Sequence, residues 1–178
     1  MKKIIIFSIL CLFSIIHAEE KLHIKADVFE IDGKTNQVVA SGNVVVTLRD
    51  VNIYGKYCTY NQKAQLVHMT KTVRVVKDEM VLTCNEVIAD GQKEIISAEG
   101  GIRFNYKTIK GQSEYALYEL GKRHVSLTGT PRAWQGEDEL LGEVIEIDLE
   151  KVKIITKGKA KVRLTIDKLK EGTKSFND

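Results

Sequence analysis

Cationic side chains recur at one position of this 178-residue sequence, at intervals of 29 residues. The members of this basic row are Arg74, Arg103, Arg132 and Lys161, and Val45 takes the first place. Guanidinium groups suit phosphate oxygens, so contact with phosphates is one interpretation of the row. The other interpretation is a solvated outer face that deters edge pairing and aggregation.

Patterns that would indicate catalysis or a metal site are missing from the sequence. His23, His68 and His124 occupy unrelated places in the 29-residue interval, and no Ser-His-Asp or Cys-His grouping can be argued. There is no H-E-x-x-H motif, phosphate loop or paired metal-ligand spacing. We therefore expect no enzyme activity, no cofactor and no metal. An enzyme would need a polar cluster among the inward-facing residues, and the pattern supplies none.

The same interval governs the rest of the chain, which reads as five repeats of 29 residues. A fixed period of this kind indicates one supersecondary unit stacked on copies of itself. One column is glycine in four repeats: Gly42, Lys71, Gly100, Gly129 and Gly158. A second column is small: Ala26, Gly55, Cys84, Ser113 and Gly142. A third is short and polar or acidic: Asp32, Asn61, Asp90, Glu119 and Asp148.

Each repeat predicts two long strands, both bent near the middle. Apolar residues alternate from Val38 to Leu48, as in a strand with one dry face. The glycine column and a switch of parity at the small column indicate bends or bulges, and the polar column supplies turn residues. Five repeats then give about ten antiparallel strands in an all-β sheet folded over an apolar interior. A closed jelly roll and an open trough both fit, whereas a parallel β-helix is disfavoured by the hairpin turns.

The inward positions form apolar columns in which small residues such as Ala89 and Ala98 leave room. Taken alone, such columns simply pack on each other. Tyr54 and Trp134 lie on outward positions, and single exposed aromatic residues are ordinary. The inward candidates are Ile31, Val38, Ala40, Val44, Val46, Tyr60, Val67, Val75, Ala89, Ile96, Ala98, Ile102, Phe104, Tyr118, Val125, Ile147 and Ile154.

The ends of the chain differ from the repeats. Residues 1–18 have two lysines, a short apolar run and a final Ala18, as in a cleaved secretory signal peptide. We expect one domain over residues 19–168 and a polar tail over 169–178. Removing Lys2 and Lys3 lowers the net charge from +3 to about +1, which gives no reason to expect nucleic acid. Cys58 and Cys84 take different places in the repeat, and we expect buried free thiols.

Two short runs then carry a family resemblance: Ile24-Lys25-Ala26-Asp27, and Ala40-Ser41-Gly42-Asn43-Val44-Val45-Val46. With the repeat and the leader, they resemble the OstA-like family, and within it the periplasmic bridge component of the lipopolysaccharide transport system of Gram-negative bacteria. Pro131 in the place of Val44, and Lys71 in the glycine column, depart from the pattern.

The resemblance implies a semi-open antiparallel β-jelly roll that carries acyl chains of lipopolysaccharide in its interior. It also implies partners in the inner-membrane and outer-membrane transport complexes, and head-to-tail self-association through edge strands. With the family in view, the inward candidates become lipid contacts, and the basic row becomes a set of possible contacts to lipid phosphates at the lip of the trough. The alternatives are the jelly-roll domain of the inner-membrane-anchored component, and a structural β-repeat protein without a ligand.

Overall fold

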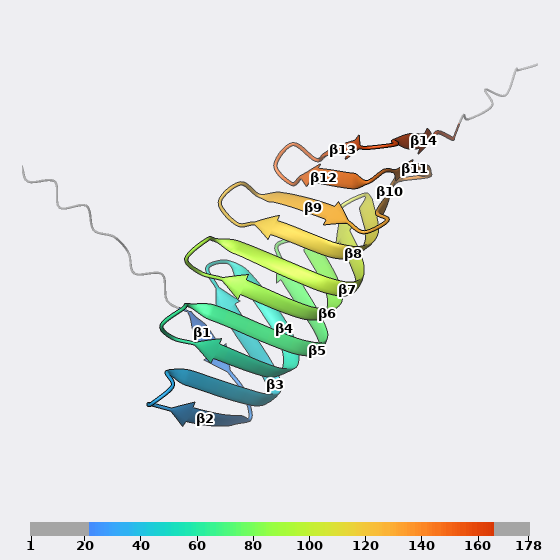
Figure 1. Ribbon diagram of the computed structural model, residues 1–178. Helices are drawn as coiled ribbons and strands as arrows, with labels where there is room; N and C mark the ends of the chain where they lie inside the picture. Colours follow the sequence, from blue (N-terminus) through green and yellow to red (C-terminus); the bar gives the residue numbers. More distant parts are fainter. Residues whose placement is uncertain (1–21, 166–178) are drawn as a thin grey trace, which may run out of the picture.

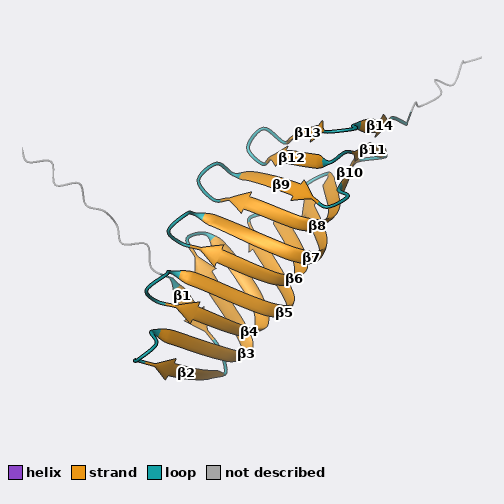
Figure 2. Cartoon of the chain, in the orientation of Figure 1, coloured by secondary structure: helices purple, strands orange, loops and turns teal. Residues whose placement is uncertain are grey.

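The computed structural model describes residues 22–165, which form a single antiparallel sheet joined by turns (Figures 1 and 2). The predicted signal peptide and the whole of the predicted tail, residues 169–178, lie outside the described residues. Six strands run the full width of the sheet: β3 (Gln37–Leu48), β4 (Val51–Asn61), β5 (Leu66–Lys77), β6 (Met80–Asp90), β7 (Ile95–Tyr106) and β8 (Ile109–Glu119). Shorter strands continue it at both ends: β1 (His23–Lys25), β2 (Val28–Asp32), β9 (His124–Thr128), β10 (Arg132–Gln135), β11 (Asp138–Leu141), β12 (Val144–Asp148), β13 (Lys153–Lys157) and β14 (Lys161–Arg163).

The sheet folds over on itself into two limbs, which share the six long strands. Limb A contains β1, one half of each strand from β3 to β8, and then β10, β11 and β14. Limb B contains β2, the other half of the same strands, and then β9, β12 and β13. Figure 1 shows the two layers and the crease that joins them. The all-β antiparallel prediction is confirmed, and the sheet stays open because its first and last strands do not pair.

The crease is made by the glycine column. Its residues have positive φ angles, from 68° to 83°, and the next residue in the chain is also left-handed. The pairing register slips by one residue at the crease between each two neighbouring long strands, for example between Ser41 and Val44. Two left-handed residues and an extra residue in the ladder turn a strand sharply, so the bend predicted from these glycines is confirmed.

The polar column has a local structural role. Asp32, Asp90 and Asp148 accept backbone hydrogen bonds from the residues two and three places ahead, and Asn61 accepts one from the Ala64 amide. These amide bonds, led by those from Lys34, Lys93 and Lys151, lower the pKa of the three aspartates. The carboxylates therefore close turns.

The ten predicted strands appear as ten rungs, but four of them are divided at the crease. The divided rungs are β1 with β2, β9 with β10, β11 with β12, and β13 with β14. In the fourth repeat the division falls at Gly129, Thr130 and Pro131, because proline has no amide hydrogen for the ladder. The divided rungs lie towards the two ends of the sheet, so these ends have fewer paired residues in each rung than the centre.

Lys71 should carry a backbone cost that its four glycine counterparts avoid, since its φ is 68°. Lys71→Gly should raise the free energy of unfolding by about 1 kcal/mol, because a left-handed backbone disfavours a Cβ atom. Urea unfolding followed by circular dichroism measures this change. Gly100→Ala is the reciprocal control and should destabilise, since its new Cβ would lie 3.0 Å from the Asn85 Cβ. A Lys71→Gly variant no more stable than the parent would contradict this account of the crease.

Candidate functional site

The space between the limbs is lined by unbroken rows of apolar residues. In limb B one row runs from Ile31 through Val38, Tyr60, Val67 and Ala89 to Ile96, and continues as cross-strand partners to Ile154. In limb A the matching row includes Val46, Ile53, Val75, Leu82 and Phe104. Cross-strand partners share one face of a sheet, so the interior is continuous along the whole stack.

Most of the residues predicted to face inward are buried between the limbs. The buried ones are Val38, Ala40, Val44, Val46, Val67, Val75, Ala89, Ile96, Ala98, Ile102, Phe104, Tyr118, Val125 and Ile147. Tyr60 and Ile154 are half-buried and pack against this core. Ile31 lies on the same inward row but is 70% exposed, because β2 is the end strand of limb B and pairs only with β3 among residues 22–165. Whether these residues touch lipid stays a prediction.

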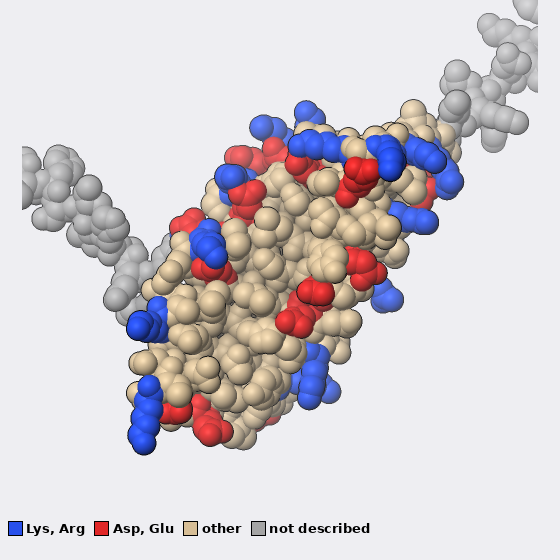
Figure 3. All heavy atoms as spheres, in the orientation of Figure 1, with Lys and Arg blue, Asp and Glu red and all other residues tan. Residues whose placement is uncertain are grey.

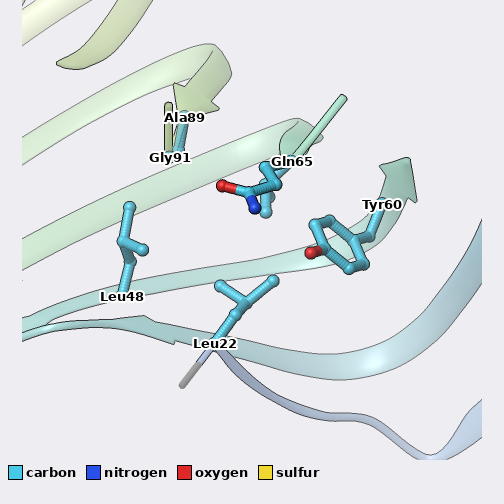
Figure 4. Close-up of a pocket in the computed structure, with 7 residues that line it drawn as sticks. Leu22, Leu48, Tyr60, Gln65, Ala89 and Gly91 are labelled. Atoms are coloured by element: carbon cyan, nitrogen blue, oxygen red, sulfur yellow. The ribbon is translucent and has the colours of Figure 1, made fainter. Parts of the chain in front are cut away.

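The interior is largely filled by its own side chains, but a hollow of about 390 Å³ remains near the N-terminal end. Leu22, Leu48, Tyr60, Gln65, Val67, Ala89 and Gly91 line it, and Figure 4 shows the side chains of Leu22, Leu48, Gln65 and Tyr60 around the opening. This volume lies within the range of small-molecule pockets, roughly 300–1,000 Å³. A lipid with several acyl chains therefore needs the limbs to move apart.

Two rows of turns face each other across the free margins of the limbs, and we call them the lips. The limb A lip comprises turns 49–50, 78–79, 107–108 and 136–137, and the limb B lip comprises turns 33–36, 62–65, 91–94, 120–123 and 149–152. Arg49 of one lip forms an ion pair with Glu94 of the other. One repeat further along, the charges are reversed: Asp78 pairs with Arg123, with 3.4 Å between Oδ2 and Nη2. The lips are thus held together by exposed ion pairs.

The lips are sealed more firmly towards the C-terminal end. The Tyr106 hydroxyl donates a buried hydrogen bond of 2.7 Å to the Leu149 carbonyl. In the preceding repeat Lys77 points inward, is almost fully buried, and pairs with Asp50 of the same limb, so this pair does not join the two lips. In the first repeat the equivalent position is Leu48, which borders the hollow. The slit therefore narrows from an open N-terminal end to a closed C-terminal end.

Polar groups inside the core are few. Among residues 22–165, the Tyr118 hydroxyl is the buried side-chain group without a hydrogen-bond partner, and burial raises its pKa. Cys58 and Cys84 are buried free thiols, and burial raises the pKa of each to about 11. The strand β5 lies between them, so the thiols are separated as the repeat predicted. At such pKa values the thiols are protonated at neutral pH and react only slowly.

The basic row lies on the outer face of limb A, as its parity indicates. Arg74, Arg103, Arg132 and Lys161 are all exposed. They follow the crease, and the lips lie at the opposite margin of the limb. In β5, β7 and β10 three residues separate the row from the turns of the limb A lip, and contact of the row with lipid phosphates stays a prediction.

The part of the chain that the structure describes contains no cluster of three or more potential metal ligands. It also has no helix of the length and apolar character that crossing a bilayer requires.

The ion pairs between the lips were not anticipated from the sequence. Arg49 and Glu94 are 45 residues apart, as are Asp78 and Arg123. The recurrence of opposite charges at this separation is a usable signal, but only once the sheet is known to fold over. Lys77 was also missed, although it is the one charged residue on the inward parity of β5.

Comparison with known proteins gives consistent matches. The family model described as LptA/(LptD N-terminal domain) LPS transport protein matches residues 23–153. The lipopolysaccharide export system protein LptA of Haemophilus influenzae is 26% identical over 144 residues, which cover 72% of this chain and 84% of that protein. A crystal structure of LptH, the LptA-homologous periplasmic component of the lipopolysaccharide transport device of Pseudomonas aeruginosa, is 15% identical with a TM-score of 0.35. That match covers 83% of this chain and 97% of the LptH chain.

The ion pairs between the lips should limit how often the interior opens. Glu94→Arg places two cations opposite each other and should speed alkylation of the buried Cys58 thiol by about fivefold, because exposed ion pairs contribute roughly 0.2–1 kcal/mol. The rate can be followed with N-ethylmaleimide and peptide mass spectrometry. Arg49→Glu/Glu94→Arg restores opposite charges and should return the rate towards the parental value. Equal rates in all three proteins would mean that these pairs do not control the opening.

Proposed function

The chain belongs to the LptA/(LptD N-terminal domain) family of LPS transport proteins, and we propose that it is a periplasmic carrier that bridges the inner-membrane and outer-membrane transport complexes. In this proposal residues 1–18 are a cleaved signal peptide and residues 19–168 form the carrier domain. The relative named LptA supports a role in transport, since it is described as a lipopolysaccharide export system protein.

The observation that carries this proposal is the continuous apolar interior. Its rows run without interruption across all ten rungs and end in exposed apolar residues. At the N-terminal end these are Phe29 and Ile31, and at the C-terminal end they are Val162 and Leu164. A closed core would cover such residues, because burying them is favourable. An apolar path that reaches exposed apolar residues at both ends of the sheet suits hydrocarbon chains that pass along it.

In the loaded state, acyl chains lie between the limbs and the sugar portion leaves through the slit between the lips. Entry of an acyl chain at the N-terminal hollow needs the least movement of the limbs, because Leu48 and Gly91 already line an open space there. Towards the C-terminal end, the hydrogen bond between Tyr106 and Leu149 would first have to break. Weak ion pairs at the lips then separate at low cost.

The ends of the sheet supply the proposed contacts with partners. β1 and β2 end the sheet on one side, and β13 and β14 end it on the other. Unpaired strand edges readily accept a strand from a neighbour. Joining the N-terminal end of one copy to the C-terminal end of the next would make the apolar interiors continuous. The same edges fit like-folded domains of the membrane complexes.

A second function is favoured by one observation. The interior is mostly filled, with residues such as Val46, Ile53 and Phe104 at 1% exposure or less. A structural repeat protein without a ligand would look the same. The jelly-roll domain of an inner-membrane-anchored component also remains an alternative for a chain of this family.

Photo-crosslinking separates the carrier from the structural alternative. A photoreactive amino acid at Val38 or Ile96, both buried between the limbs, should label lipopolysaccharide. The adjacent positions Val39 and Ser97 face outward on the same strands and are the matched controls. Ile96→Asp should block loading, because an unpaired charge in hydrocarbon is costly. Equal labelling at inward and outward positions would rule out transport through the interior.

Self-association should depend on the exposed apolar residues at the sheet ends. Ile31→Lys should shift the protein from concentration-dependent oligomers to monomers in analytical ultracentrifugation, without changing its circular dichroism. Ile88→Lys is the matched control, because Ile88 is also exposed but lies on the outer face of limb B away from both ends. If the two variants associate equally, head-to-tail pairing through β2 is wrong.

A further inference from the structure

The outer faces of the two limbs carry opposite charge, although the whole chain is nearly neutral. On limb A the outward residues include the cations Lys25, Arg74, Arg103, Lys110, Arg132, Lys161 and Arg163, and one carboxylate, Glu139. On limb B the outward residues include Glu30, Asp32, Glu86, Asp90, Glu99, Glu119, Glu146 and Asp148, and the lysines there, Lys153 and Lys157, are confined to β13. Figure 3 shows limb B from outside, with lysine and arginine only at its margins.

The cations of limb A form a straight line. Lys25, Val45, Tyr54, Arg74, Thr83, Arg103, Gln112, Arg132, Leu141 and Lys161 are successive cross-strand partners. A cation therefore recurs at every second strand from β5 onwards, about 9.6 Å apart, so that Arg74 and Lys161 are roughly 29 Å apart, and Lys25, three strands before Arg74, extends the line to roughly 43 Å. Among the described residues, Lys25, Arg74, Arg103, Lys110 and Lys161 form no ion pair with a carboxylate. Their charge is available to an external anion.

We propose that the outer face of limb A docks on the surface of an anionic phospholipid bilayer. An evenly spaced line of cations matches a laterally uniform negative surface, to which each lysine or arginine adds attraction. The residues between the cations fit the same surface. Tyr54 stacks under Arg74 at 5.9 Å and is partly exposed, and the half-buried Trp134 lies next to Lys110. Tyrosine and tryptophan are enriched at the interface between membrane and water.

The geometry favours a membrane over an acidic protein. Protein interfaces are centred on exposed apolar anchors, but the one large apolar side chain that is well exposed on the strands of this face is Tyr54. The outer face of limb B, with Tyr57, Ile88 and Tyr115 exposed, is better suited to a protein partner. A shallow hollow of about 340 Å³ lies between Arg103 and Arg132, and its lining also includes the carboxylate Glu114. The two arginines outnumber this carboxylate, so the hollow keeps a net positive charge that favours the phosphate groups of lipid headgroups.

Docking in this way sets the orientation of the molecule. Limb A would face the membrane, limb B would face away from it, and the strand direction would lie along the bilayer surface. The slit between the lips would then open sideways, parallel to the bilayer. Acidic limb B would be repelled by the same surface, so the charge difference between the limbs selects one orientation.

Vesicle binding tests the proposal, and the single tryptophan of the sequence, Trp134, reports the orientation. Mature protein should sediment with phosphatidylcholine vesicles containing roughly one-third phosphatidylglycerol, but not with pure phosphatidylcholine. Binding should be lost when salt rises from about 0.05 to 0.5 M. Trp134 fluorescence should shift to the blue and be quenched by brominated lipid. These vesicles contain no lipopolysaccharide, so the result does not depend on the proposed transport function.

Matched variants make the test specific to limb A. Arg74→Gln/Arg103→Gln/Lys161→Gln should weaken vesicle binding on the order of 100-fold, at about fivefold per cation. Lys34→Gln/Lys63→Gln/Lys153→Gln removes the same charge from the lip of limb B and from β13, and should stay within about twofold of the parent. Equal loss in both triple variants, or binding with Trp134 unquenched, would overturn the proposal. So would oligomers that form without vesicles and disappear in the limb A variant, because this face would then contact acidic limb B of another copy.

Discussion

The fold depends on a pair of left-handed residues at the middle of every second strand, one pair in each repeat. A sheet with one apolar face must cover that face, and this chain has no helix among its described residues to do so. The sheet covers itself by bending along one crease. At the crease the residue after the small column donates a backbone hydrogen bond to the carbonyl of the glycine column, as in Asp27 to Gly42 at 3.0 Å and Glu143 to Gly158 at 2.9 Å. Because these bonds recur at the same place in the repeat, the crease falls at the same position in each repeat and both limbs stay in register.

The repeat made much of this architecture predictable. Strand alternation, the turn at Asp32 and the bend at Gly42 are all local signals in the sequence. Because the five repeats can be aligned, the bend is still predicted in the repeat where Lys71 replaces glycine. Inward and outward parity also followed, since both halves of a strand alternate. Ile31 shows the limit, because its exposure results from the position of β2 at the end of the sheet. The sequence around Ile31 resembles the equivalent segments of the repeats in which this position is buried.

Contacts between the limbs could not be predicted in the same way. Tyr106 meets Leu149, and Arg49 meets Glu94, only because two turns at opposite ends of different strands come together when the sheet folds. Nothing in a single repeat specifies the angle of the crease. The charge difference between the limbs was hidden for a related reason. The net charge of the chain sums the charges of both outer faces. Arg103 and Glu99 lie on the same strand, and only the position of the crease between them shows that they belong to different limbs.

The range of the contacts has a consequence for how such a chain changes over evolutionary time. Every strand pairs with its neighbours in the repeat, and the ties between the lips reach 45 residues along the chain. No contact described above depends on the total number of repeats. Duplication or loss of one 29-residue unit would leave each remaining neighbour in place, and would change the length of the molecule by two strands, about 9.6 Å. The length of the molecule can therefore change in steps of one repeat. The cross-section of the folded sheet stays the same at every length.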